Sequence, residues 1–184
     1  MPLRCVLTLI VLGFGIATPV WSKRLDVTRP DAPRNLPTQG PVSVQWRDPA
    51  RFSELRNSRN RSEARRGDWV MQLATYLRKR AEKRLPPGQR LDVEITDIQR
   101  AGNYEPWHGI QFHDVRFLRD LYPPRIDLTF ERLDADSVVI ATGERRLSDF
   151  AYLSSAAGAG HSDPLRYEKR LIDRWLAREL SPRE

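Results

Sequence analysis

The stretch Tyr122-Pro123-Pro124-Arg125-Ile126-Asp127-Leu128-Thr129-Phe130 decides how the middle of the chain folds. Neither proline can donate a hydrogen bond to a neighbouring strand, so the pair ends whatever precedes it. Every second residue from Ile126 to Phe130 is apolar, which predicts a strand with one apolar and one solvated face. After turn-forming residues at 134–137, a second run from Val138 to Leu147 supplies the returning strand of a hairpin.

Two segments have the apolar spacing of amphipathic helices. The first extends from Asp68, a predicted N-cap, to about Lys83, and Pro86-Pro87-Gly88 ends it. The second follows Asp163-Pro164, a cap-and-proline start signal, and keeps its apolar residues on one stripe as far as Leu180. Each helix therefore has one face to bury.

Apolar alternation predicts further strands at residues 42–46 and 91–96, and a weaker alternation suggests one at 115–121. The residues between 56 and 66 are polar throughout and predict a loop. Strands that alternate strictly are covered on one face only, so both helices should lie on the same side of the sheet. We predict an α+β fold: a two-layer sandwich with an antiparallel or mixed sheet of four to five strands and two amphipathic helices on one face.

The N-terminus has the layout of a secretory signal peptide. Arg4 precedes an apolar run from Cys5 to Ile16, and the residues before Ser22 suit cleavage after that serine. Retention as a membrane anchor is the alternative, but a span needs about 20 apolar residues, more than this run supplies. We expect residues 1–22 to be a signal peptide and the protein to be periplasmic or secreted.

The rest of the chain divides into a leader and one domain. Residues 23–41 contain four prolines among polar residues, so we expect a Pro-rich disordered leader. Residues 42–180 are expected to form a single α+β domain, with no transmembrane helix after signal cleavage. The only cysteine is Cys5, so the mature chain would contain no disulfide, thiol nucleophile or thiolate metal site.

The charge is concentrated in one region. The net charge is +7, and residues 47–90 contain 13 Lys or Arg against 5 acidic residues, an excess larger than that of the whole chain. Such a region can attract nucleic acid, anionic lipid or acidic polymers, and export argues against nucleic acid. The alternative interpretation is a solvated arginine-rich surface with no dedicated ligand.

Residues 101–114 form a long loop that is rich in aromatic side chains. Tyr104 and Trp107 could stack on a sugar or peptide, with Arg65 and Arg66 meeting its carboxylates or phosphates. In the alternative interpretation, Trp107 and Phe112 fill the open end of the sandwich, each burying about 150–250 Å². Ligand-binding candidates are Tyr104, Trp107, His108, His113, Arg65 and Arg66.

Two patterns offer catalytic chemistry. His108 and His113 share the aromatic loop and could hold zinc, but their spacing fits neither a helical nor a strand pair, so local hydrogen bonding is expected and neither metal nor cofactor is predicted. Asp92 and Glu94 point to one face of a predicted strand, as an acid pair for glycoside cleavage would. Acidic residues on an alternating strand are more often its solvated face.

Five short phrases follow one another along the chain. They are Trp46-Arg47-Asp48-Pro49, Leu85-Pro86-Pro87-Gly88 before Leu91-Asp92-Val93, Thr96-Asp97-Ile98 with Ala101-Gly102, Pro123-Pro124-Arg125-Ile126, and Asp163-Pro164-Leu165-Arg166-Tyr167-Glu168 with Trp175. In this order and spacing they resemble a family of short exported bacterial proteins known only as domain of unknown function 3016. The resemblance covers roughly Val42 to Glu179. It implies export and a single domain, but no activity, cofactor or catalytic residue.

From these patterns we expect a non-enzymatic, exported module of the bacterial envelope that binds an acidic polymer, a lipid surface or a protein partner. The alternative is a small envelope hydrolase that uses the Asp92/Glu94 face or a metal at His108/His113. The sequence leaves the ligand and the oligomeric state open.

Overall fold

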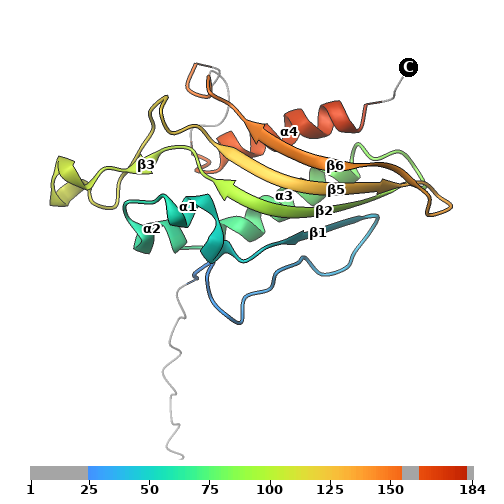
Figure 1. Cartoon of the computed structure of the whole chain (residues 1–184), viewed down its shortest axis with the longest axis horizontal. Helices are drawn as coiled ribbons and strands as arrows, with labels where there is room; N and C mark the ends of the chain where they lie inside the picture. Colours follow the sequence, from blue (N-terminus) through green and yellow to red (C-terminus); the bar gives the residue numbers. More distant parts are fainter. Residues whose placement is uncertain (1–24, 155–161, 182–184) are drawn as a thin grey trace, which may run out of the picture.

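The computed structural model describes residues 25–154 and 162–181 (Figure 1). The predicted signal peptide, the first residues of the leader and the Gly- and Ala-rich stretch at 155–161 lie outside the described residues.

A four-stranded mixed sheet forms one layer, in the order β1-β2-β5-β6. β1 (Val42–Trp46) runs parallel to β2 (Arg90–Gln99), which runs antiparallel to β5 (Arg125–Leu133). β6 (Val139–Ser148) returns antiparallel to β5, so these two strands are the predicted hairpin. Because every second residue is apolar, the register brings the apolar residues of neighbouring strands together on one face.

The two long helices form the second layer, on that apolar face (Figure 1). They are α3 (Trp69–Glu82), which packs mainly on β1, and α4 (Arg166–Glu179), which packs on β5 and β6. The Trp175 ring of α4 meets Phe130 of β5 edge to face, with ring centroids 5.7 Å apart. The predicted α+β sandwich, with both helices on one face of a mixed sheet, is therefore confirmed.

Among the described residues, seven shorter elements occur in the connections between these strands and helices. They are η1 (Pro49–Arg51), α1 (Ser53–Arg56), α2 (Arg61–Arg65), β3 (Asn103–Tyr104), η2 (Pro106–His108), η3 (Ile110–Phe112) and β4 (Arg116–Phe117). The polar stretch expected as a loop thus contains α2, which begins where the Asn60 side chain accepts a hydrogen bond from Glu63 N–H. The strand expected at 115–121 is only β4, which pairs with β3 outside the main sheet.

Residues 25–41 are folded onto the domain, which corrects the prediction of a disordered leader for this part of the chain. Leu36 N–H donates to the Val44 carbonyl at 2.9 Å, and Trp46 N–H donates to the Arg34 carbonyl at 2.8 Å. The side chains of Val27 and Leu36 are buried in the core. Val27 and Leu36 are nine positions apart and fit neither a helical nor a strand period. The sequence pattern of this segment is therefore set by its prolines, which predict disorder.

Replacing Leu36 with Ala should destabilise the whole domain. Leu36 is 6% exposed, so its truncation leaves a cavity and lowers the free energy of unfolding by about 2–3 kcal/mol. The matched control is Leu25→Ala, at a leucine that is 54% exposed, with an expected change below about 0.5 kcal/mol. Urea unfolding measures both variants, and equal stability of the two would show that the leader is not part of the fold.

Candidate functional site

An outlying loop, residues 105–122, extends beyond the end of the sheet where β2 ends and β5 begins (Figure 1), and we call it the tip. The described residues contain eleven exposed large apolar side chains, and six of them lie in the tip. These six are Trp107 (56% exposed), Ile110 (91%), Phe112 (41%), Val115 (41%), Leu118 (38%) and Leu121 (66%). Such a concentration of apolar side chains in solvent is typical of a docking surface.

The polar groups of the tip converge on the buried carboxylate of Glu105. Arg119 donates to both of its oxygens, from Nε to Oε1 at 2.8 Å and from Nη2 to Oε2 at 2.7 Å. The Tyr122 hydroxyl donates to Oε1 at 3.1 Å, and His108 Nε2 lies 2.8 Å from Oε2. The His108 ring also stacks on Phe117, with centroids 4.7 Å apart. The loop is therefore closed around an ion pair, and its apolar side chains are left outside.

These contacts keep Glu105 ionised. The hydrogen bonds from Arg119 lower the pKa of Glu105 from 4.5 to about 2, against the burial that raises it, and His108 and Tyr122 lower it further. The same hydrogen bonds raise the pKa of Arg119. We call this pair of Glu105 and Arg119 the clamp. Both of its members are charged at any pH near neutrality.

A second buried ion pair fixes the tip to the domain. Arg116, on β4, pairs with Glu54 of α1, a carboxylate that is 1% exposed. Nη1 of Arg116 also donates to the Gly102 carbonyl at 2.9 Å. The second oxygen of Glu54 accepts from Arg100 N–H at 2.9 Å. Gly102 has φ 78°, and a Cβ there would lie 2.6 Å from the Phe117 carbonyl oxygen, so only glycine permits β3 and β4 to approach this closely.

Exposed arginines lie beside the tip, on the segment that contains α1 and α2. We call this set the collar: Arg56, Arg59, Arg61, Arg65 and Arg66. The Arg59 guanidinium lies over the Trp107 ring, 4.5 Å from its centroid. Asn60 Nδ2 donates to the His113 carbonyl at 2.9 Å. The segment of the collar and the tip, which are distant in the sequence, are therefore in contact at Arg59 and Asn60.

The predicted ligand residues do not all meet. Tyr104 is buried, with the Arg116 guanidinium 4.7 Å from its ring centroid, so this ring has no open face for a sugar. Arg65 and Arg66 lie at the end of α2 and pair with Asp26 at 3.3 Å and Glu63 at 2.9 Å. Arg59, which the sequence interpretation did not select, is the collar residue that contacts Trp107.

The aromatic residues of the tip do not fill the end of the sandwich, because Trp107 and Phe112 are both exposed. Tyr152 and Tyr167 pack there instead, in a separate buried cluster with Ala101, with their rings edge to face and centroids 4.8 Å apart. Because Tyr152 and Tyr167 fill this position, the aromatic side chains of the tip stay exposed to solvent.

His108, His113 and Glu94, three residues of the two predicted catalytic patterns, each contact another side chain of the domain. His113 Nδ1 lies 3.2 Å from Asn60 Nδ2, whereas His108 faces Glu105, so the two imidazoles have separate partners. Among the described residues, no group of three or more His, Cys, Asp or Glu side chains could hold a metal ion. Glu94 pairs with Arg47 at 3.1 Å on the open face of the sheet, which is lined mainly by polar residues.

One family matches this chain. A family model described as a protein of unknown function (DUF3016) covers residues 40–178, which include the sheet, both long helices and the tip. The chain belongs to the DUF3016 family. No curated protein and no solved structure matches it. Within the described residues of this DUF3016 protein, no helix has the length and apolarity to cross a membrane.

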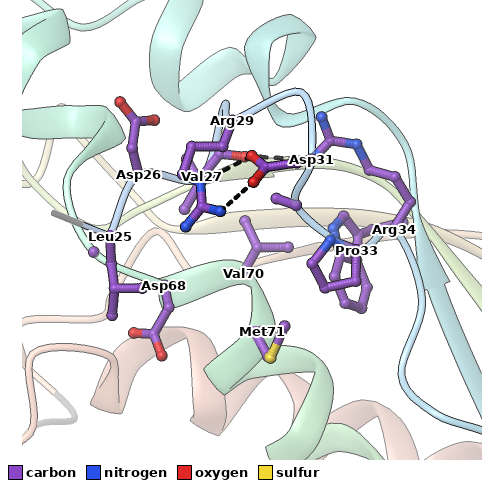
Figure 2. Close-up of a pocket in the computed structure, with 13 residues that line it drawn as sticks. Leu25, Asp26, Val27, Arg29, Asp31, Pro33, Arg34, Asp68, Val70 and Met71 are labelled. Carbon is purple, nitrogen blue, oxygen red and sulfur yellow. Dashed lines mark hydrogen bonds and ion pairs between the residues drawn. The ribbon is translucent and has the colours of Figure 1, made fainter. Parts of the chain in front are cut away.

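Figure 2 shows a small crevice of this DUF3016 protein, between the folded part of the leader and α3. Val27, Pro33, Val70 and Met71 line it, and an ion pair between Arg29 and Asp31, 2.5 Å long, crosses its rim. Its volume is about 120 Å³, whereas sites for small-molecule ligands occupy about 300–1,000 Å³. The crevice is therefore too small for such a ligand. The tip with its collar is the candidate site because it gathers six of the exposed large apolar side chains of the described residues.

The Glu105 clamp predicts how the tip responds to acid. A carboxylate with a folded pKa of about 2, against 4.5 ordinarily, contributes stability that is complete above about pH 4.5 and is lost as the pH falls towards 2. The indole N–H signal of Trp107, followed by NMR, should therefore keep its native position at about pH 3.5 and move only near pH 2.

Glu105→Gln supplies the control for this titration. Without the charge, the variant should already show near neutral pH the Trp107 signal that the native protein reaches only near pH 2. A midpoint near 4.5 in the native protein would contradict the clamp, because an unpaired carboxylate titrates there.

Proposed function

We propose that this DUF3016 protein is a non-enzymatic binding module of the bacterial envelope that attaches to an anionic lipid surface through the tip and the collar. One observation carries the proposal: six exposed apolar side chains lie on one projecting loop, and the segment with the exposed arginines of the collar reaches it through the contact of Arg59 with Trp107. The layout of residues 1–22, typical of a signal peptide, supports an envelope location.

The shape of the tip favours lipid over a soluble ligand. Ile110 is 91% exposed and Leu121 66%, and an acidic polymer offers such side chains nothing to bury against. A lipid surface does, because burying one large apolar side chain is worth about 1.5–3 kcal/mol. Trp107 has the amphipathic ring that sits at the headgroup level of a bilayer.

The collar supplies the electrostatic part of the attraction. Arg56 and Arg61 form no ion pair among the described residues, so their charges are available to acidic headgroups. Each basic residue near an anionic leaflet contributes about 1 kcal/mol, and the effect fades beyond a Debye length of about 8 Å in physiological salt. Apolar insertion and charge therefore act at the same end of the molecule.

The clamp holds the tip in one conformation before it binds. Glu105 and Glu54 are both buried and paired with arginines of the tip, so the loop has little conformational freedom left to lose on docking. A loose loop with the same sequence would lose part of its binding free energy to ordering.

Removing two apolar side chains from the tip should weaken attachment. We expect Ile110→Ser with Leu121→Ser to reduce binding to vesicles of phosphatidylglycerol and phosphatidylethanolamine by at least about tenfold, since each buried side chain contributes more than about 1.4 kcal/mol. Vesicle flotation measures the bound fraction. Val138→Ser is the matched control, because Val138 is 58% exposed but lies in the turn before β6, outside the tip.

Neutralising the collar should weaken attachment only at low salt. Arg56→Gln with Arg61→Gln should lower binding several-fold at about 0.05 M salt and leave it nearly unchanged at about 1 M, where the Debye length is about 3 Å. If the native protein binds no anionic vesicle, or binds neutral vesicles equally well, the lipid proposal is wrong. Capture of an envelope protein by the tip in the absence of vesicle binding would assign a protein partner instead.

A further inference from the structure

The two edges of the sheet are treated differently. The outer edge of β1 is covered by the leader, where Asn35 forms a bridge with Gln45 and two main-chain hydrogen bonds reach Arg34 and Leu36. At the opposite edge, β6 pairs with β5 on one side, and no strand of the described residues pairs with its other side. β6 is ten residues long, so it presents a long row of main-chain donors and acceptors.

β6 combines charged residues in its second half with exposed apolar residues near its ends. The strand contains no proline, and exposed apolar side chains lie at both of its ends. Val139 is 47% exposed and Ile140 38% at its start, whereas Phe150, just past its end, is 74% exposed. In its second half, Glu144 and Arg146 point to the same face, two positions apart, with opposite charges.

We propose that a second copy of this chain pairs with β6, antiparallel and about a two-fold axis at Arg145, so that the two sheets join into one. In this register Glu144 of each copy lies opposite Arg146 of the other, and the symmetry forms the pair twice. The proposal goes beyond membrane attachment and rests on different residues.

Neighbouring registers lack this complementarity. With the axis one residue earlier, Glu144 faces its own symmetry copy, and with the axis one residue later, Arg146 does so, which places like charges opposite each other. With the axis at Gly143, the two charged residues face Thr142 and Ile140. Of these four registers, only the axis at Arg145 places Glu144 opposite Arg146.

The side chain on the axis is already neutralised. Arg145 pairs with Glu179 of α4 at 3.0 Å and lies over the Phe130 ring, so the two symmetry-related guanidinium groups are each held on the helix side of the sheet. Arg145 Nη1 also donates to the Glu144 carbonyl at 3.0 Å, and a carbonyl oxygen retains a second lone pair for a strand amide. Glu144 forms no ion pair within the described residues, and the Arg146 contact with Asp127 is long, at 3.5 Å.

The contact is small. A strand edge with its flanking side chains lies at the lower end of protein–protein interfaces, below about 1,200 Å², so a dimer with a dissociation constant of roughly micromolar order is expected. Sedimentation velocity over a range of protein concentrations measures it.

Charge reversal tests both the partner and the register. Glu144→Arg and Arg146→Glu should each weaken dimerisation at least about tenfold, because each places like charges opposite one another twice. The double variant Glu144→Arg with Arg146→Glu should restore the native dissociation constant. Glu131→Arg, an equal charge change at an exposed position of β5, is the control and should leave dimerisation unchanged.

The outcomes separate this proposal from the previous one. A protein that stays monomeric at about 1 mM overturns it, and so does a dimer that the single charge reversals do not weaken. Loss of the dimer in Ile110→Ser with Leu121→Ser would also overturn it, by placing the contact at the tip. Circular dichroism confirms that each variant is folded, and vesicle binding should be unaffected by the charge reversals.

Discussion

The carboxylate of Glu105 determines what the tip presents to solvent. It is buried and accepts two hydrogen bonds from Arg119 and one from Tyr122, so the strongest polar groups of the loop face inwards. A loop of this length cannot also bury its apolar residues, and they remain outside. In most surface loops the polar side chains face solvent, whereas in the tip they face the buried carboxylate and the apolar side chains face solvent. The tip therefore presents a projecting apolar surface without a second hydrophobic core.

A chain of buried polar contacts connects that surface to the sandwich. Arg116 of the tip pairs with Glu54, Glu54 accepts from the Arg100 main chain, and Glu168 of α4 accepts from the next amide, Ala101 N–H, at 2.6 Å. Burial raises the pKa of Glu168, whereas the nearby Arg100 guanidinium lowers it. Truncating any one of these groups would leave a buried partner unsatisfied. The position of the tip is therefore coupled to the end of β2 and to the start of α4.

The sequence predicts the sandwich well and the candidate site only in part, for physical reasons. The hairpin and both long helices have a regular apolar period, and such a period can be read directly from the sequence. Glu105 and Arg119 are fourteen positions apart in an irregular loop, so no spacing rule joins them. The aromatic content of 101–114 marks the right segment, but only packing shows that Tyr104 is buried and Trp107 exposed. The sequence does not predict that residues 25–41 fold onto the domain, because the buried residues Val27 and Leu36 follow no helical or strand period.

The position of Trp107 in a bilayer tests the central claim most directly. Bromine atoms placed at known depths on the acyl chains of anionic vesicles quench a nearby indole, and the difference between the native protein and Trp107→Phe isolates this residue from the buried Trp46, Trp69 and Trp175. We predict that bound protein shows a quenched component that is absent in Trp107→Phe and is strongest with shallow bromines, at the level where indole rings reside. Bound protein whose Trp107 emission is unaffected by bromine at every depth would contradict insertion of the tip.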